Sequence, residues 1–354
     1  MVGHDEDLSA IEELSVVRLH SLRANKKMTD NNGIHSGSLQ FYPRVRAKKV
    51  VPSVNWAPVS RDGVGFMGFV GYKVGMISVW AKDDTEASMT KGKRIAIPAT
   101  VVECPAMKIY SVRFYKNRKV VKDVVVANGK DLKKSVKVSK KAMNGEQLDV
   151  SSKELGDDGF DDVRVIMYSG VKGTCVDKNK ADMLEIGLGG SKDEKLAFIK
   201  EKIGKEILVR DVFGKGLVDV RGVTKGFGSS GPVKRFGIAL KSYKSEKGRR
   251  RPGSLAPWHP ARVTFRAPQM GQHGYFTRIN YNNLILEVGS RESVVGSRDI
   301  NPKGGFEHYG VVKNDYVILK GSVMGPQKRG IVMTSPIRPT KFQAKKKFEI
   351  MEIR

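Results

Sequence analysis

Apolar residues along this chain gather in short runs rich in Val, Ile and aromatic residues rather than in long helical stripes. Such runs occupy 64–80, 95–103 and 108–115, and similar runs return over 206–223 and 282–335. Gly and Pro separate them, which is typical of strands bounded by turns. We therefore expect a mainly β fold whose strands come from two stretches that are distant in the sequence.

The middle of the chain has a different pattern. A strand-like run begins at Val163, after a stretch that is first Lys-rich and then acidic. Ser191 followed by Glu194 has the form of a capping box, and the next apolar residues stand at helical spacing until Gly204. This predicts a helix that begins after Ser191 and ends near the glycine. We interpret 116–204 as an α+β insertion within the β fold.

Residues 225–278 follow no regular period for long. They contain twelve Lys/Arg against one acid, Glu246, together with eight Gly, five Pro and seven aromatic residues. This segment cannot bury enough apolar surface to offset a backbone ordering cost of about 1–2 kcal/mol per residue. A polyanion would neutralise the charge and offer the rings a stacking surface. A disordered basic linker is the alternative, but it would not need the rings.

A second basic segment, 33–60, precedes the first strands. Pro43 and Pro52 favour an extended backbone, which can follow a chain of phosphates. The alternative is a solvated leader strand. Four cations lie close together in it, without an acid nearby: Arg44, Arg46, Lys48 and Lys49.

The charge of the whole chain points in the same direction. Its 354 residues carry a net charge of +27, and the sequence pI is near 9.9. Such a charge repels itself in a free protein and suits one that binds phosphates. The sequence has no run of about 18 apolar residues and no long basic amphipathic helix, which argues against a membrane partner.

Residues 1–32 are expected to be a variable N-terminal extension. Its first 27 residues carry five acids and four bases with a weakly amphipathic pattern. They fit a peripheral helix, or a gene start placed upstream of Met28, and they lack the pattern of a signal peptide.

Catalytic and metal-binding patterns are weak. Cys104 and Cys175 have no CxxC spacing, so we expect neither a disulfide framework nor a zinc site. The GxGxxG at 63–68 follows a loop and leads into strand-like residues, which is unlike a dinucleotide-binding turn. His259 and His273 have no nucleophile or carboxylate at a suggestive local spacing. No catalytic residue, metal ligand or cofactor is assigned.

Two features stand out in the middle of 225–278. Three adjacent arginines, 249–251, repel one another without counter-anions, and guanidinium planes bind phosphate oxygens and stack on bases. Trp258 lies between Pro257 and His259–Pro260, and the two prolines stiffen the backbone around it. Few apolar residues stand near it in the sequence. We interpret the ring as an exposed contact rather than a core residue.

An ordered series of motifs extends across most of 33–340. They read GSLQFYPRVRA (37–47), GFVGYKVGM (68–76), VVECPAMKIYSVRFY (101–115), DVFGKGLVDVRGVTKGFGSSGPVKR (211–235), PWHPARV (257–263), MGQHGYFTRINYNN (270–283) and GGFEHYGVVKNDYVILKGSVMGPQKR (304–329). This series resembles the large-ribosomal-subunit protein L-three family in its archaeal and eukaryotic form.

The resemblance implies a structural, non-enzymatic protein of the large ribosomal subunit that binds 23S-type rRNA directly and supports early subunit assembly. It implies a translation-protein-type β-barrel with an α+β insertion, a long basic internal loop and an extended N-terminal arm. The matching loop tip, with Trp258, would lie near the peptidyl-transferase centre. Its partners would be rRNA and neighbouring ribosomal proteins in the cytoplasm, with no membrane or small-molecule substrate. An RNA-acting enzyme or another basic RNA-binding accessory factor is the alternative.

These expectations divide the chain into six parts. They are an extension at 1–32, an rRNA-binding arm at 33–60, barrel strands at 61–115 and 205–340, the insertion at 116–204, an rRNA-penetrating loop at 225–278, and a basic tail at 341–354. The residues expected to bind rRNA are Arg44, Arg46, Lys48, Lys49, Lys225, Lys234, Arg235, Arg249, Arg250, Arg251, Trp258, His259, Arg262, Arg266, His273, Tyr275, Arg278, Lys328 and Arg329.

Overall fold

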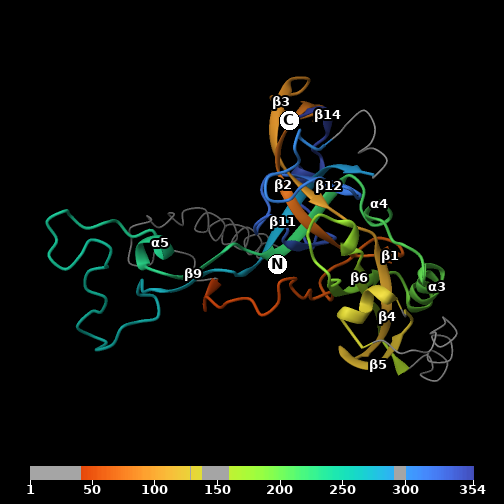
Figure 1. Cartoon of the computed structure of the whole chain (residues 1–354), viewed down its shortest axis with the longest axis horizontal. Coiled ribbons are helices and arrows are strands. Elements are labelled where there is room, and N and C mark those ends of the chain that lie inside the picture. Colours follow the sequence, from red (N-terminus) through yellow and green to blue (C-terminus); the bar gives the residue numbers. More distant parts are fainter. Residues whose placement is uncertain (1–40, 128, 138–158, 291–299) are drawn as a thin grey trace, which may run out of the picture. The chain divides into compact units, whose positions relative to one another are not determined.

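The computed structural model describes residues 41–127, 129–137, 159–290 and 300–354 (Figure 1). It is mainly β, as the sequence predicts. The chain forms two compact units. The larger unit comprises Arg46–Gly226 and Gly274–Arg354, and the smaller unit comprises Phe227–His273 with the described residues 41–45. The expected extension at 1–32, the first residues of the arm and most of the acidic part of the insertion lie outside the described residues.

A seven-stranded antiparallel sheet forms the first part of the larger unit. β2 pairs with β3, β3 with β12, β12 with β11, β11 with β8, and β8 with β13, while β13 also pairs with β2. The pairings of these six strands thus form a closed circuit, and β14 lies beside β2. The bounds are β2 Gly68–Asp83, β3 Arg94–Glu103, β8 Gly216–Val223, β11 Thr277–Gly289, β12 Tyr316–Lys320, β13 Gly330–Thr334 and β14 Phe348–Ile353.

Strands of this sheet bury apolar residues on both faces. Along β12, Val317 packs into one hydrophobic cluster and its neighbour Ile318 into another. Val102 and Val101 of β3 divide in the same way. Successive side chains of a strand point to opposite faces, so a strand covered on both faces reads as a continuous apolar run. This explains why these runs lack a polar alternation.

A five-stranded antiparallel sheet forms the second part, in the order β1, β7, β6, β4, β5. The bounds are β1 Gly65–Phe66, β4 Met107–Lys116, β5 Lys119–Val125, β6 Asp162–Ser169 and β7 Met183–Gly189. The placement of 108–115 with the barrel strands is therefore wrong, because β4 pairs with β5 and β6. The chain changes sheet at Pro105, which has no N–H group to continue a ladder.

Helices are short in the described chain. α3 (Lys192–Lys202) confirms the predicted capping box: the Ser191 N–H donates to Glu194 Oε2 at 2.8 Å. The helix ends before Gly204, whose φ is +78°. A strand expected over 206–213 is instead the turn-like helix α4 (Val209–Val212), because Asp211 Oδ2 accepts the Leu208 N–H at 3.1 Å. The other short elements are η2 Lys130–Lys134, η4 Val171–Gly173 and α7 Lys341–Ala344.

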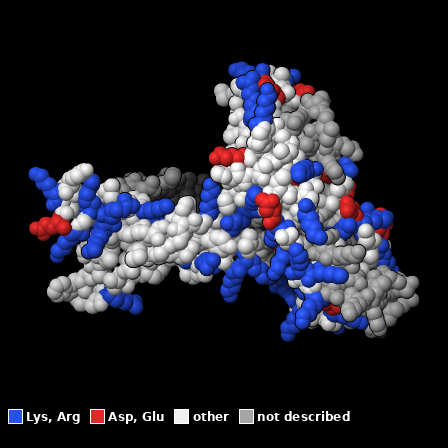
Figure 2. All heavy atoms as spheres, viewed as in Figure 1, with Lys and Arg blue, Asp and Glu red and all other residues white. Residues whose placement is uncertain are grey.

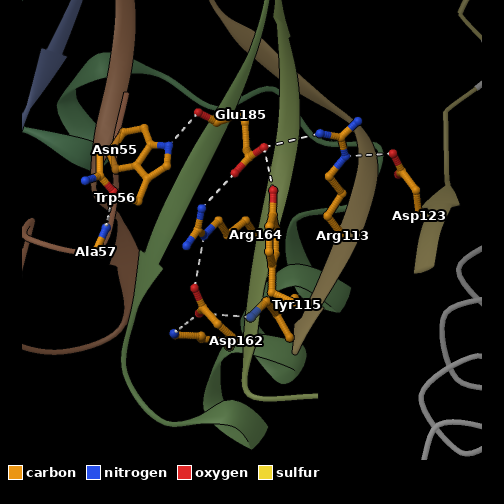
Figure 3. A network of polar contacts seen from close by, with 11 residues as sticks. Asn55, Trp56, Ala57, Arg113, Tyr115, Asp123, Asp162, Arg164 and Glu185 are labelled. Carbon is orange, nitrogen blue, oxygen red and sulfur yellow. Dashed lines mark hydrogen bonds and ion pairs between the residues drawn. The ribbon is translucent and has the colours of Figure 1, made fainter. Parts of the chain in front are cut away.

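Charged residues connect four strands of the five-stranded sheet, β7, β6, β4 and β5 (Figure 3). Glu185 of β7 accepts hydrogen bonds from Tyr115 Oη at 2.8 Å, Arg164 Nη1 at 3.0 Å and Arg113 Nη1 at 3.3 Å. Burial works to lower the pKa of Arg164, but its two carboxylate partners raise that pKa overall. These arginines also contact two further carboxylates, Asp123 (2.8 Å) and Asp162 (3.0 Å).

The chain's last residues pair with the seven-stranded sheet. The expected basic tail at 341–354 contains α7 and then β14, which pairs with β2 from Asp83 back to Val79. The smaller unit contains a two-stranded ribbon, β9 (Gly226–Ser230) with β10 (Gly271–Gly274), and the helix α5 (Pro232–Phe236).

Candidate nucleic-acid interface

The basic loop begins and ends in neighbouring strands. β8 and β11 pair antiparallel with Val223 opposite Thr277. Beyond them, the Thr224 N–H donates to Phe276 O and the Tyr275 N–H donates to Lys225 O, both at 3.0 Å. The strand pairing therefore fixes where both ends of the loop leave the larger unit.

Within the smaller unit, Arg235 holds the first turns of the loop together. α5 begins with Pro232, which suits a first helical position, and ends at Gly237 in the left-handed conformation with φ 70°. From this helix the Arg235 guanidinium donates to Gln272 O at 3.0 Å and Gln269 O at 2.9 Å. Both acceptors lie at the returning end of the loop. The side chain thus ties the two ends of the smaller unit together.

The N-terminal arm contributes a second arginine to this place. Arg44 Nη1 donates to Arg235 O at 3.1 Å, and its guanidinium carbon lies 4.2 Å from the centre of the Phe236 ring. Burial and then the nearby Arg44 charge lower the pKa of Arg235. Tyr42 meets Phe265 edge to face, with ring centres 5.8 Å apart. Cations held by carbonyl oxygens and rings keep their formal charge, because none of these partners is an anion.

An aromatic pair spans the β9–β10 ribbon. The Phe227 and His273 rings stack with centres 5.0 Å apart, and Lys234 Nζ lies 4.4 Å from the centre of the Phe227 ring. Burial, followed by the charges of Lys234, Arg44 and Arg235, lowers the pKa of His273. The imidazole is therefore neutral near pH 7 and acts here as a stacking ring.

Beyond α5 the loop has little regular structure. Arg249 closes a small turn, because its Nε donates to Lys241 O at 3.2 Å. Its guanidinium carbon lies 4.0 Å from the centre of the Tyr243 ring. Trp258 is 88% exposed, so the ring belongs to no core in this structure. Exposed cations surround this part of the loop: Arg250, Arg251, Arg262 and Arg266. His259 is exposed as well.

The smaller unit has no apolar core. Within Phe227–His273, all of which the structure describes, no apolar side chain is buried. The same stretch carries ten Lys/Arg against Glu246. Figure 2 shows Lys and Arg side chains along the segment that carries α5 and β9 in Figure 1. A unit of this kind presents charge and rings to solvent and gains little stability from burial.

The remaining predicted residues lie in the larger unit. The Arg46 and Arg329 guanidinium carbons lie 5.3 and 5.1 Å from the centre of the Tyr275 ring. Lys328 forms an ion pair with Asp177 at 2.7 Å, so its charge is already matched. Arg278 lies over Phe276, 5.0 Å from the ring centre. Three lysines are exposed: Lys48, Lys49 and Lys225.

Comparison with known proteins accounts for this arrangement. A family model described as Ribosomal protein L3 matches residues 28–353. The chain belongs to the ribosomal protein L3 family. One similar protein, Large ribosomal subunit protein uL3 of Methanocaldococcus jannaschii, is 40% identical over 313 residues, which are 86% of this chain and 91% of the relative. The protein of the same name from Archaeoglobus fulgidus is 41% identical over 315 residues, 86% of this chain and 92% of the relative.

Sequence reasoning missed several rings of this L3-family chain that the structure places against cations. Each stands within a few residues of an arginine or lysine along the chain, so the interleaving of rings and charges was the available signal. It does not say which ring meets which cation, because Arg44 and Phe236 are distant in the sequence. The missed rings are Tyr42, Phe227, Phe236 and Tyr243.

The parts of this L3-family chain that the structure describes contain neither a candidate metal site nor a membrane-spanning helix. No group of three or more His, Cys, Asp and Glu side chains there could hold a metal ion. No helix among those residues has the length and apolar character needed to span a membrane.

Proposed function

We propose that this chain is a structural constituent of the large ribosomal subunit that binds large-subunit rRNA directly and catalyses no reaction. Membership of the ribosomal protein L3 family supports this role. The observation that carries the proposal is the smaller unit, which combines ten cations and one acid with no buried apolar side chain. A polyanion supplies the interactions that such a unit lacks.

The finer assignments rest on the same basis. The closed circuit β2–β3–β12–β11–β8–β13 is the translation-protein-type barrel expected for the family. The α+β insertion at 116–204 contributes α3 and strands of the five-stranded sheet, which β1 and β4 complete from outside it. The loop within 225–278 and the arm within 33–60 enter the rRNA. The loop tip with Trp258 lies near the peptidyl-transferase centre. The protein joins the subunit early in assembly, beside other ribosomal proteins in the cytoplasm.

The exposure of the tip supports its part in this assignment. Trp258 and Phe265 are 88% and 69% exposed, and exposed rings beside arginines are the usual platforms for unpaired bases. Lys48 and Lys49 of the arm are exposed too. Their charges contact phosphates in this proposal, while the loop rings contact bases.

A salt titration with a large-subunit rRNA fragment tests the proposal. We expect the logarithm of the binding constant to fall linearly with the logarithm of salt concentration, because each neutralised phosphate releases counterions. Arg250→Ala with Arg251→Ala should lower the magnitude of the slope by about 1–2, since up to two phosphate contacts are lost.

The matched control is Lys91→Ala with Lys93→Ala, which removes the same charge from exposed positions in the β2–β3 connection of the larger unit. This variant should keep a slope closer to that of the unmodified protein. A binding constant that does not respond to salt would overturn the proposed mode of binding.

A further inference from the structure

Tyr275 is fixed where three segments of the larger unit meet. Its φ is 55°, in the left-handed region that residues other than Gly rarely adopt. Its N–H donates to Lys225 O at 3.0 Å, and its carbonyl accepts the Ala47 N–H at 2.9 Å. Gly226 lies close to the Tyr275 side chain: a Cβ atom at Gly226 would be 3.5 Å from Tyr275 Cβ. The position of this ring is thus set by the arm and by both ends of the loop.

Four cations stand on the segments that meet at Tyr275, and two of them, Arg46 and Arg329, lie against its ring, with guanidinium carbons 5.3 and 5.1 Å from the ring centre. Lys225 is the residue whose carbonyl accepts the Tyr275 N–H, and the Lys73 N–H donates to Arg329 O at 3.0 Å. Lys73 donates from Nζ to Val323 O at 2.5 Å and Gly325 O at 3.1 Å. These contacts fix the return loop, which is the connection between β12 and β13, residues 321–329, that carries Arg329. Burial and then the charge of Lys225 lower the pKa of Lys73, so these two lysines are close enough to repel each other. We call these four cations with Tyr275 the Tyr275 cluster.

The cluster's charge is not matched by nearby acids. Among the described residues, none of its four cations forms an ion pair with a carboxylate. Two acids beside the residues that flank Arg329 are engaged elsewhere: Asp177 pairs with Lys328, and Asp182, near Gly330, accepts from Lys178 and from the Tyr72 hydroxyl. Converging like charges destabilise one another unless an anion lies between them.

Arg329 adds a second, independent sign of a missing partner. Its Nη1 atom is buried and has no hydrogen-bond partner within the described chain. Its stem packs against Gly325, where a Cβ would approach Arg329 Cγ to 2.7 Å. A guanidinium that is held in place and buried at one nitrogen is expected to have an acceptor, because leaving such a group unpaired costs about 1–3 kcal/mol.

We propose that the Tyr275 cluster is a site for a phosphate group, and that an RNA backbone phosphate fills it in the assembled particle. The site joins the arm, the loop ends and the return loop around one anion. Tyr275 then serves as a support for guanidiniums rather than as a platform for a base, since its ring is already in contact with two of them. This inference rests on the proposed function for the source of the phosphate, but the residues of the site already lie together in the free protein.

Inorganic phosphate is the probe for the free protein. The intact chain is unfolded thermally in phosphate and in chloride at equal ionic strength, with each variant carried through both series. Phosphate stabilises most proteins by exclusion from their surface, and that part should be common to all variants. The unmodified chain should show an additional, saturable stabilisation. Arg329→Ala should weaken the apparent phosphate affinity about tenfold, the effect of losing one charge-assisted contact.

Two further variants keep the result interpretable. Lys225 is exposed, so Lys225→Ala should weaken phosphate binding without affecting folding. Lys91→Ala with Lys93→Ala removes two exposed charges from the β2–β3 connection and should leave the saturable stabilisation intact. An equal response of all these proteins to phosphate would overturn the site.

An RNA measurement separates the two proposals. The same rRNA fragment is bound in the presence and absence of inorganic phosphate, and phosphate should compete with it in the unmodified chain more than in Arg329→Ala. Binding of the fragment with no effect of Arg329→Ala in either assay would overturn the site alone. A chain that binds phosphate saturably but does not bind the fragment would contradict the proposed function instead.

Discussion

The arginines of the five-stranded sheet and those of the smaller unit have opposite kinds of partner. In the five-stranded sheet, Arg113 and Arg164 face the carboxylate of Glu185 and one further acid each. In the smaller unit, Arg44 and Arg235 contact backbone carbonyls and the Phe236 ring. Carboxylates cancel the charge that they bind, whereas carbonyls and rings only orient it. The same residue type therefore stabilises a sheet in one unit and presents positive charge in the other.

This difference also separates stability from binding. The sheet network is partly buried, so losing one of its carboxylates exposes the other members to an unfavourable environment. In the proposed function, the loop cations gain their counter-charges from RNA. Substitutions in the first region should act on the free energy of unfolding, and those in the second on affinity for RNA.

Glu185→Ala should have the largest effect on stability. It removes an acceptor shared by Arg113, Arg164 and Tyr115. The two arginines keep Asp123 and Asp162, so we expect a loss of about 2 kcal/mol in the free energy of unfolding. Urea unfolding of the free protein measures it.

The matched control is Glu201→Ala on α3. The Glu201 side chain is 60% exposed and pairs only with exposed or half-exposed lysines, so its loss should change stability by less than about 0.5 kcal/mol. Equal effects of the two variants would show that the sheet network does not contribute in the way described.

Arg235→Lys should have an intermediate effect, confined to the smaller unit. Lysine keeps the charge but cannot span Gln269 O and Gln272 O with a planar fork. We expect faster amide hydrogen exchange in the β9–β10 ribbon and α5, and about severalfold weaker RNA binding because the ends of the loop are less ordered. The urea midpoint of the larger unit should not move.

Lys234→Arg on the same helix is a suitable control for this substitution, because Lys234 is exposed. If Arg235→Lys leaves exchange in the ribbon unchanged, the carbonyl contacts do not order the loop.

Trp258→Ala should have the smallest effect on stability. The ring is 88% exposed, so its removal should change the free energy of unfolding by less than about 0.5 kcal/mol. Binding to an rRNA fragment that contains its contact should weaken by about 1–3 kcal/mol, the range found for a stacked base. A lower melting temperature for this variant would place the ring in a core and contradict its role as an exposed contact.

Local signals in the sequence predicted local structure well. The capping box at Ser191 and the stop near Gly204 are determined by residues close in the chain, and α3 follows them. The short apolar runs likewise predicted the mainly β fold. Sheet membership was less accessible: β4 continues directly from β3 in the sequence, yet it pairs with β6 some fifty residues later. Pairing depends on partners that one sequence does not reveal.

The candidate interface shows the same limit. Charge and composition were sufficient to select the loop and the arm. They could not show that Lys328 is neutralised by Asp177, or that Lys73 binds the return loop that carries Arg329. Lys73 stands within a strand-like run and was not selected, because only the folded chain brings its ammonium group to the carbonyls of Val323 and Gly325.

The pairing of β8 with β11 has a consequence for how this protein can change. Since the two strands already bring the ends of the loop together, the chain between them can grow or shrink at little thermodynamic penalty: doubling its length adds only about 0.6 kcal/mol of closure entropy. Insertions and deletions between Gly237 and Met270 would thus leave the sheet intact. The loop can therefore change in length and sequence while the paired strands that carry it stay the same.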